Sequence, residues 1–197
     1  MMRVGTITRR LRRFGRDKSG SITFELLTSV LVMNMILLAF FYWWQTYSYH
    51  ALVDRMTYTV NDLITRQRGL TLERRFLDGL ETTAEFILDP DQDAAIRFTQ
   101  VTMRPGEAPG DPPYIAVDWS YSPCQAKPMA VAGPGFDADS LPMMAVGATM
   151  IVTEVEVPFT PDFDLIPALT FERRAVSLYR FEMRFDLQGD GTSTCID

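Results

Sequence analysis

The sequence predicts an α+β protein: a long N-terminal transmembrane helix and stalk, followed by a small antiparallel β-sheet head. Three observations lead to this prediction. A stretch of 19 residues, Leu26–Trp44, is almost wholly apolar. Apolar residues then recur at helical spacing, and runs with strand-like alternation take over after Pro90. We expect four segments: a basic cytoplasmic leader at 1–20, a transmembrane helix at 21–44, a helical stalk and short helix at 45–90, and a sheet domain at 91–197.

The charge of the chain divides sharply near residue 20. Residues 1–20 hold seven basic residues and one acidic residue, a net charge of +6, whereas the rest of the chain holds 12 basic and 24 acidic residues, a net charge of −12. An apolar stretch follows the basic residues at once, which favours an anchor beside an anionic membrane surface over an arm that binds nucleic acid. The acidic remainder argues against nucleic-acid binding by the main domain.

The apolar stretch has the length and the flanks of a membrane span. No Asp, Glu, Lys or Arg lies between Leu26 and Val53, and a helix of 19 residues rises about 28 Å, enough to cross a hydrocarbon layer of about 30 Å. Basic residues before a span hold the N-terminus in the cytoplasm, so we expect a single-pass protein of the bacterial inner membrane with a periplasmic C-terminal domain. A secretory signal peptide would end in small residues. Here the far end carries rings typical of the headgroup level: Phe40, Phe41, Tyr42, Trp43, Trp44, Tyr47 and Tyr49.

Helical spacing continues beyond the span and predicts one helix from near Ser21 to about Arg68. Gly69 is a reasonable stop signal, and a second short helix is expected over Thr71–Leu80. The apolar positions that share one face of the long helix are Leu52, Met56, Val60, Leu63 and Ile64.

In the remaining chain, apolar and polar residues alternate as they do in half-buried strands. Two segments rich in proline and glycine, 104–113 and 122–142, interrupt the alternation and predict loops. The strand candidates are Ile96–Met103, Tyr114–Tyr121, Met150–Phe159 and Ala175–Phe185.

Glu25 is a charged residue at the head of the apolar helix, with Phe24 and Leu26 beside it. A carboxylate at the edge of a bilayer is costly and therefore points to a function, although the position also fits the last interfacial residue before a span. A cut after Gly20 would make Glu25 the fifth residue of the mature chain.

Over about its first 45 residues the chain resembles type IV prepilins. The shared pattern is a basic leader, a glycine, four mostly apolar residues, a glutamate and a long apolar helix, carried here by Gly20, Ser21–Phe24 and Glu25. The resemblance implies that a prepilin peptidase cuts after Gly20 and frees an α-amino group on Ser21. In such families the amine of a neighbouring subunit stabilises the buried glutamate during assembly.

Within that class, the leader RRFGRDKSG and the following SITFELL are most similar to TadE-like minor pseudopilins of tight-adherence (Flp) pilus systems. Val152–Phe163 and Phe171–Glu182 resemble the paired strands that close those proteins, whereas the span lacks the proline often found in the family, and Trp43-Trp44-Gln45 stands where a second acidic residue often occurs. The resemblance implies a minor subunit that supports pilus assembly. Its implied partners are the prepilin peptidase, other pilin or pseudopilin subunits and the lipid bilayer, with no nucleic acid.

A function from another class stays open. The same N-terminal features fit a signal-anchored periplasmic binding or sensing domain with an uncleaved N-terminus. Cleavage at Gly20 separates the two, because a plain signal anchor needs no such site.

The two cysteines, Cys124 and Cys195, both follow the span. In an exported domain a disulfide between them is plausible, and closing a loop of about 70 residues would stabilise the fold by roughly 4 kcal/mol. Two unrelated thiols are the other interpretation.

No residue pattern indicates an enzyme, and we expect no catalytic site, cofactor or metal. His50 is the one histidine, and no nucleophile-elbow, phosphate-loop or dinucleotide-binding motif occurs. The acidic run Asp89–Asp93 superficially resembles a calcium loop, but Ala94 and Gln100 stand where such a loop needs glycine and glutamate. A solvated acidic turn is the better interpretation.

Overall fold

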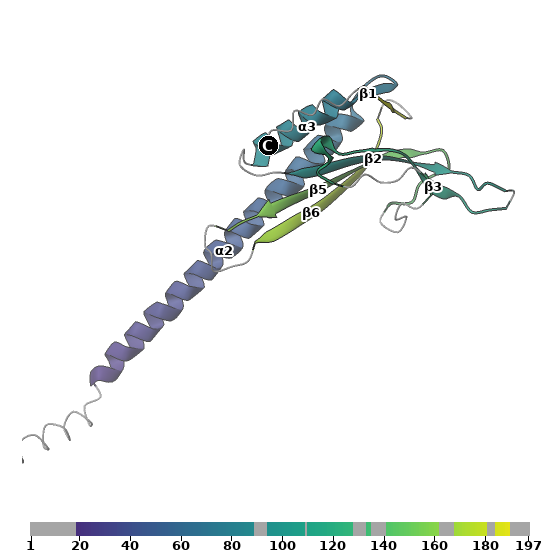
Figure 1. Cartoon of the computed structure of the whole chain (residues 1–197). Coiled ribbons are helices and arrows are strands. Elements are labelled where there is room, and N and C mark those ends of the chain that lie inside the picture. Colours follow the sequence, from purple (N-terminus) through teal and green to yellow (C-terminus); the bar gives the residue numbers. More distant parts are fainter. Residues whose placement is uncertain are drawn as a thin grey trace, which may run out of the picture. The chain divides into compact units, whose positions relative to one another are not determined.

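A helix of 47 residues, α2 (Ser19–Thr65), opens the part of the chain that the structure describes. The computed structural model describes residues 19–88, 94–108, 110–127, 133–134, 141–161, 168–180 and 184–189. The chain divides into two compact units, Met1–Thr46 and Tyr47–Asp197, and α2 continues from the first into the second without a break (Figure 1). In the first unit, the described residues are helical throughout.

The second unit is built on an antiparallel sheet of five strands. In spatial order they are β4 (Gly133–Pro134), β3 (Tyr114–Tyr121), β2 (Ala95–Arg104), β5 (Thr149–Phe159) and β6 (Leu169–Leu178). β-Branched residues are frequent in β5, and they favour the extended backbone because they pack well on a pleated surface. The structure therefore confirms an α+β fold in which a long N-terminal helix precedes a small antiparallel sheet.

Shorter elements complete the second unit. Helix α3 (Arg74–Leu88) follows β1 (Thr71–Glu73), which pairs in parallel with β7 (Asp186–Gln188). A single 3-10 turn, η1 (Pro123–Gln125), follows β3.

The larger hydrophobic core lies between the two helices and one face of the sheet. The second half of α2 contributes Val53, Met56, Val60 and Ile64, all fully buried. From α3 and the sheet come Leu77, Leu80, Ala84, Ile96, Phe98, Ile151, Val155 and Val157.

A second apolar cluster covers the opposite face of the sheet, where Leu141 and Met144 pack against it. Because β5 contributes to both clusters, it is buried on both faces along most of its length. The buried members of this cluster are Val101, Ile115, Val117, Met150 and Val152.

Asn61 forms a polar bridge inside the apolar interface between α2 and the sheet. Its side-chain amide donates to Ser177 Oγ at 2.7 Å, and its carbonyl oxygen accepts from Thr153 Oγ1 at 3.0 Å. Both polar ends of Asn61 are thus satisfied, which removes the cost of burying them. Both hydrogen bonds can form together at only one register of α2 along the sheet.

Ionic contacts join α2 to β6 and to the residues that directly follow it. Asp54 pairs with Arg173 at 2.6 Å, and Asp62 pairs with Arg180 at 2.9 Å. The backbone amide of Arg180 also donates to the carbonyl of Thr65. These contacts advance in the same order along both segments, so β6 runs beside α2 in the same direction.

The predicted helix over Thr71–Leu80 is wrong at its start. Its first three residues form β1 because they pair with β7, a segment more than a hundred residues later in the chain, and α3 then continues to Leu88. The long helix ends at Thr65, slightly before the predicted Arg68, and Gly69 follows with a φ of 113°. An L side chain rarely adopts that conformation, so Gly69 suits the turn.

The last predicted strand, Ala175–Phe185, is displaced. The strand in fact covers Leu169–Leu178, because it pairs with β5 from Phe159↔Leu169 to Met150↔Leu178. The chain leaves the sheet after Leu178, and Phe185 instead packs edge-on against Tyr179, with 4.6 Å between ring centroids.

Candidate membrane and assembly segment

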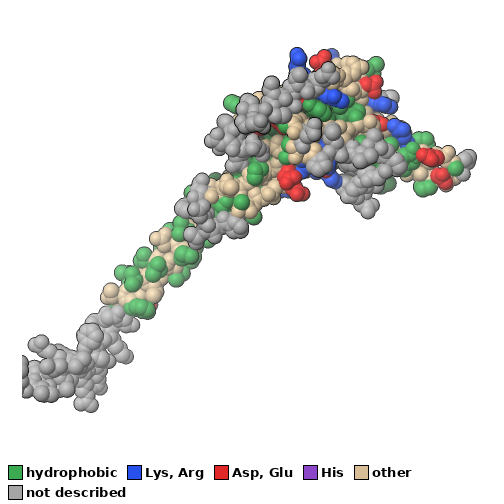
Figure 2. Space-filling model, in the orientation of Figure 1, with side chains coloured by type: hydrophobic (Ala, Val, Ile, Leu, Met, Phe, Trp, Pro, Cys, Tyr) green, Lys and Arg blue, Asp and Glu red, His purple; other side chains and the backbone are tan. Residues whose placement is uncertain are grey.

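The first unit presents an uncovered apolar helix. The most apolar window of α2 has a mean hydropathy of 2.1 and none of it is buried, and α2 is long and apolar enough to cross a membrane. Large apolar side chains from Ile22 to Trp44 are 50–72% exposed (Figure 2). A helix that is apolar on all sides requires a surrounding of lipid or of other helices.

The predicted processing residues lie at the beginning of this helix. α2 begins at Ser19, so Gly20 and Ser21 belong to its first turn, where backbone N–H groups have no partner within the helix. Glu25 lies four residues after Ser21, and residues four apart share one helix face at about 6 Å along the axis. The Glu25 side chain is exposed. The leader, residues 1–18, lies outside the described residues.

Thr28 is a polar residue of the apolar segment whose hydroxyl group is satisfied by the helix itself. Its Oγ1 donates to the carbonyl oxygens of Phe24 and Glu25, at 3.0 Å in each case. Such bonds allow threonine to enter a hydrocarbon layer, because no donor is left without an acceptor.

Large rings end the apolar segment, where the sequence predicts a belt at the headgroup level. Trp43, Trp44 and Tyr47 are each more than 60% exposed. Each ring has an apolar body and a polar N–H or O–H group, the combination that favours the boundary between lipid and water.

Cys124 is disulfide-bonded, and no free cysteine is found among the described residues. Cys195, its predicted partner, lies outside the described residues. Cys124 has a φ of 51° within η1, in the left-handed region that few residues other than glycine adopt.

Glu81 is a buried carboxyl group that the sequence analysis missed. It is 9% exposed on the inner face of α3. Its pKa is raised from 4.5 to about 7, chiefly because burial disfavours the charged form and also because the negative charges of Glu85 and Asp78 lie nearby. The signal in the sequence was its helical spacing with the buried residues Leu77, Ala84 and Leu88.

A second buried carboxylate, Asp118, belongs to a satisfied polar network. Its side chain is 1% exposed and accepts hydrogen bonds from Gln100 at 3.1 Å, from the Thr102 hydroxyl group, and from Arg104 at 2.9 Å. The Tyr179 hydroxyl donates to Gln100 Oε1 at 2.8 Å, and burial raises the pKa of Tyr179. This network fixes the positions of its side chains, and the raised pKa of Tyr179 keeps its hydroxyl group protonated at neutral pH.

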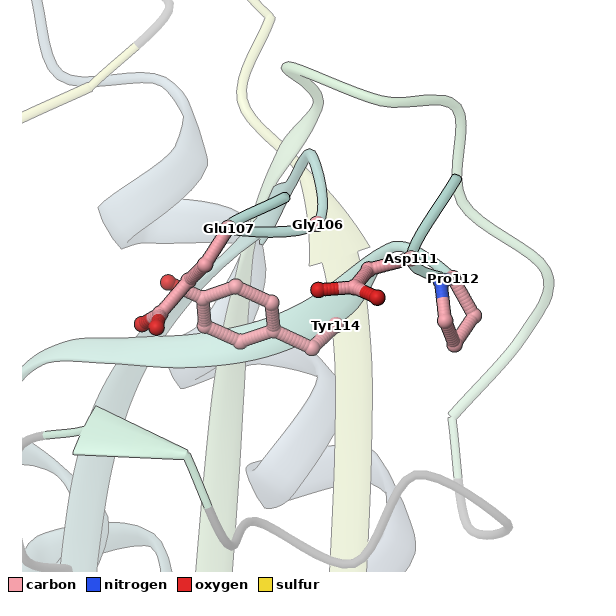
Figure 3. A pocket seen from close by; sticks show the side chains of 5 residues that line it. All are labelled: Gly106, Glu107, Asp111, Pro112 and Tyr114. Carbon is pink, nitrogen blue, oxygen red and sulfur yellow. The ribbon is translucent and has the colours of Figure 1, made fainter. Parts of the chain in front are cut away.

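A shallow hollow lies at the turn between β2 and β3, where the structure places two carboxylates. Asp111 Oδ2 accepts the backbone N–H of Ala108 at 3.1 Å. A Cβ on Gly106 would lie 2.5 Å from Asp111 Cβ and from its backbone oxygen, so glycine is needed there for the loop to close. The lining residues are Gly106, Glu107, Asp111, Pro112 and Tyr114 (Figure 3).

The described part of the chain contains no group of three or more His, Cys, Asp or Glu side chains suited to a metal ion. The acidic run Asp89–Asp93 lies outside the described residues. The ring of His50 packs edge-on against Phe171 at 5.6 Å, and its Nδ1 lies 3.4 Å from Asp54.

Comparison of the chain with protein-family models, with curated proteins and with solved structures finds no match.

Proposed function

We propose that this chain is a prepilin-type minor subunit that supports assembly of a tight-adherence pilus or a related pseudopilus. The observation that carries the proposal is the uncovered apolar helix. It begins at the residues that resemble a prepilin cleavage site, and it continues as the same helix into a folded α+β unit. The precursor spans the inner membrane once, with its N-terminus in the cytoplasm and residues 47–197 in the periplasm.

The processing step is hydrolysis of the amide bond between Gly20 and Ser21 by a prepilin peptidase. It replaces a neutral peptide nitrogen with an α-amino group, which is largely protonated near neutral pH. It also removes a leader of net charge +6. Moving those cations through the hydrocarbon layer would cost free energy, so an uncleaved leader opposes extraction of the helix. Cleavage therefore converts an anchored precursor into a subunit that can leave the membrane.

Glu25 supplies the negative charge that complements the new α-amino group of Ser21. Its carboxylate projects from an apolar helix, where an unpaired charge is costly as soon as lipid or another helix covers it. The Ser21 amine of an adjacent subunit satisfies that charge during assembly. The pairing makes correct stacking of subunits depend on prior cleavage, and it requires no catalytic group or cofactor in this chain.

The test is the N-terminal mass of the full-length protein extracted from membranes with and without the prepilin peptidase. A new terminus at Ser21 that requires the peptidase is expected. Glu25→Gln should insert into the membrane and be processed, yet lose most incorporation into assembled fibres, whereas Glu25→Asp should retain part of it because the charge remains.

An intact leader in both samples would contradict the proposal. The chain would then be treated as a signal-anchored binding or sensing domain. Normal assembly of Glu25→Gln would leave the processing step in place but refute the charge pairing.

A further inference from the structure

The disulfide of Cys124 is in contact with a buried acid. Cys124 Sγ lies 3.9 Å from Oε2 of Glu81, whose side chain is 9% exposed on the inner face of α3. Because Cys124 is disulfide-bonded, its sulfur carries no proton. A hydrogen bond between the two atoms therefore requires the proton of the Glu81 carboxyl group, with sulfur as a weak acceptor. Glu81 is thus placed to give a proton to this sulfur.

Cys124 is also accessible from solvent. Ser122 and Pro123 before it are buried, whereas Cys124 is exposed. Its φ of 51° within η1 is a left-handed conformation, which costs free energy in a residue that has a Cβ. Exposed or strained disulfides exchange with external thiols more readily than buried, relaxed ones. The disulfide therefore combines access for a thiol with an acid in contact with one of its sulfur atoms.

The groups around Glu81 hold its proton near neutral pH. Burial, and then the negative charges of Glu85 and Asp78 on the same helix, raise the pKa of Glu81 to about 7. From β3, the Tyr121 hydroxyl group donates to Asp78 Oδ1 at 2.6 Å, and burial raises the pKa of Tyr121, so this hydroxyl group stays neutral. Arg74 lies over the Tyr121 ring, 5.7 Å from its centroid. The core residues that α2 and β2 contribute beside α3 are apolar.

We propose that the disulfide of Cys124 is a redox-active site that exchanges with an external thiol, and that Glu81 is its proton donor and acceptor. The site lies within the second unit and goes beyond the proposed function, on which it does not depend. The chemical class of its reaction partner is a thiol reductant for opening and the corresponding disulfide for closure.

In the opening step, the thiolate of the reductant attacks the other sulfur of the disulfide and forms a mixed disulfide with it. The original S–S bond breaks, its electron pair passes to Cys124 Sγ, and this sulfur takes the proton from Glu81 Oε2. A second reductant thiol resolves the mixed disulfide, so two thiols are oxidised for each disulfide that is reduced. In closure the steps reverse, and the Glu81 carboxylate accepts the proton of the Cys124 thiol.

The two protonation states of Glu81 act on opening in opposite directions. The protonated carboxyl group favours opening because Cys124 can then leave as a neutral thiol. The ionised carboxylate opposes opening because it repels the negative charge that develops on a sulfur 3.9 Å away. Glu81 should therefore accelerate opening at acid pH and slow it at alkaline pH. A neutral side chain of the same shape should lose both effects.

The test is the rate at which reduced glutathione opens the disulfide of the oxidised full chain in detergent, in the wild type and in Glu81→Gln. Quenching with excess N-ethylmaleimide and mapping the peptides by mass measures the rate and identifies the sulfur that carries glutathione. The ratio of the wild-type rate to the variant rate at each pH cancels the ionisation of glutathione itself. Glu81→Asp keeps an acid but withdraws it by one methylene group. Glu73→Gln, at an exposed position of β1, is the matched control.

The ratio of wild-type to Glu81→Gln rates should fall from several-fold above one at about pH 5.5 to below one at about pH 8.5, with its midpoint near the Glu81 pKa of about 7. Glu81→Asp should lie between the wild type and Glu81→Gln at both ends of the range. Glu73→Gln should match the wild type throughout. Cys124 should be recovered as the thiol blocked by N-ethylmaleimide, because it is the leaving sulfur.

A ratio that stays at one over this range would overturn the proton-transfer role of Glu81. Glutathione bound to Cys124 would also overturn it, because Cys124 would then be the attacked sulfur. If the wild type does not open at any pH, the disulfide is not an exchange site. A purely structural effect has the opposite sign at alkaline pH, because Glu81→Gln removes a buried charge and should stabilise the fold there. Slower opening of this variant at about pH 8.5 would therefore refute the proposal as well.

Discussion

Glu81 illustrates at the scale of one residue how burial changes the chemistry of a side chain. The charges nearest to it on α3, Asp78 and Glu85, are also negative, so the ionised form is disfavoured twice. Its pKa is about 7 in the folded protein and about 4.5 in the unfolded chain. Between these values the folded state binds more protons. The contribution of Glu81 to stability is therefore fully present below about pH 4.5 and is lost as the pH rises through 7.

Glu81→Gln should remove this pH dependence. At pH 8 the variant is expected to gain on the order of 1–2 kcal/mol in free energy of unfolding, because a buried charge is replaced by a neutral isostere, and to gain little at pH 5. Urea titrations of the full chain in detergent at both pH values measure the difference. Glu73→Gln, at an exposed position of β1, is the control. An equal gain at both pH values would contradict the role assigned to ionisation.

At the scale of the element, the position of α2 on the sheet depends on the Asn61 bridge. The apolar contacts of Met56, Val60 and Ile64 would tolerate small shifts of the helix, since the hydrophobic effect has no direction. The hydrogen bonds to Thr153 and Ser177 would not tolerate such shifts, because the distance between donor and acceptor can vary by only a few tenths of an ångström. Asn61 therefore selects the register, and the apolar neighbours supply most of the stability.

Asn61→Ala should lower the free energy of unfolding by about 1–3 kcal/mol, because the buried Thr153 hydroxyl loses its acceptor. Asn61→Leu restores the side-chain volume but not the bonds, and it separates the loss of packing from the loss of polar contacts. Thr59→Ala, at an exposed position of the same helix, should change stability by less than about 0.5 kcal/mol. Thermal melts followed by near-ultraviolet circular dichroism provide the measurement. Equal effects at positions 59 and 61 would refute the bridge.

At the scale of the whole molecule, the two units hold their helix by different means. In the second unit α2 is held by the core. In the first unit no described side chain of the apolar window is buried, so its helix depends on its own backbone hydrogen bonds, which are strengthened wherever lipid or detergent excludes water.

Heating the full chain in detergent should therefore unfold the second unit while leaving part of the helix intact. Near-ultraviolet circular dichroism, which reports packed aromatic residues such as Trp119, should be lost in one transition. The helical far-ultraviolet signal should fall only in part. Complete loss of both signals in the same transition would contradict the independence of the two units.

Much of the fold follows from local patterns. The uncharged stretch from Leu26 to Val53 predicts the long helix, and alternation predicts β3 with the bounds that the structure gives it. These features depend on neighbouring residues, so periodicity is sufficient to find them. The candidate processing residues, Gly20, Ser21 and Glu25, are likewise a local pattern, and the structure adds that they lie in the first turns of one helix.

The remaining features depend on residues far apart in the chain. Pairing with β7 makes Thr71–Glu73 a strand within a segment of helical spacing, and pairing with β5 moves the last strand to Leu169–Leu178. The raised pKa of Glu81 likewise results from folding, which removes its carboxyl group from water. Sequence thus sets which segments are helical, extended or apolar, because those properties are local. Strand register, strand partners and the pKa of a buried group depend on contacts between segments that are far apart in the chain. They are therefore set only when the core assembles.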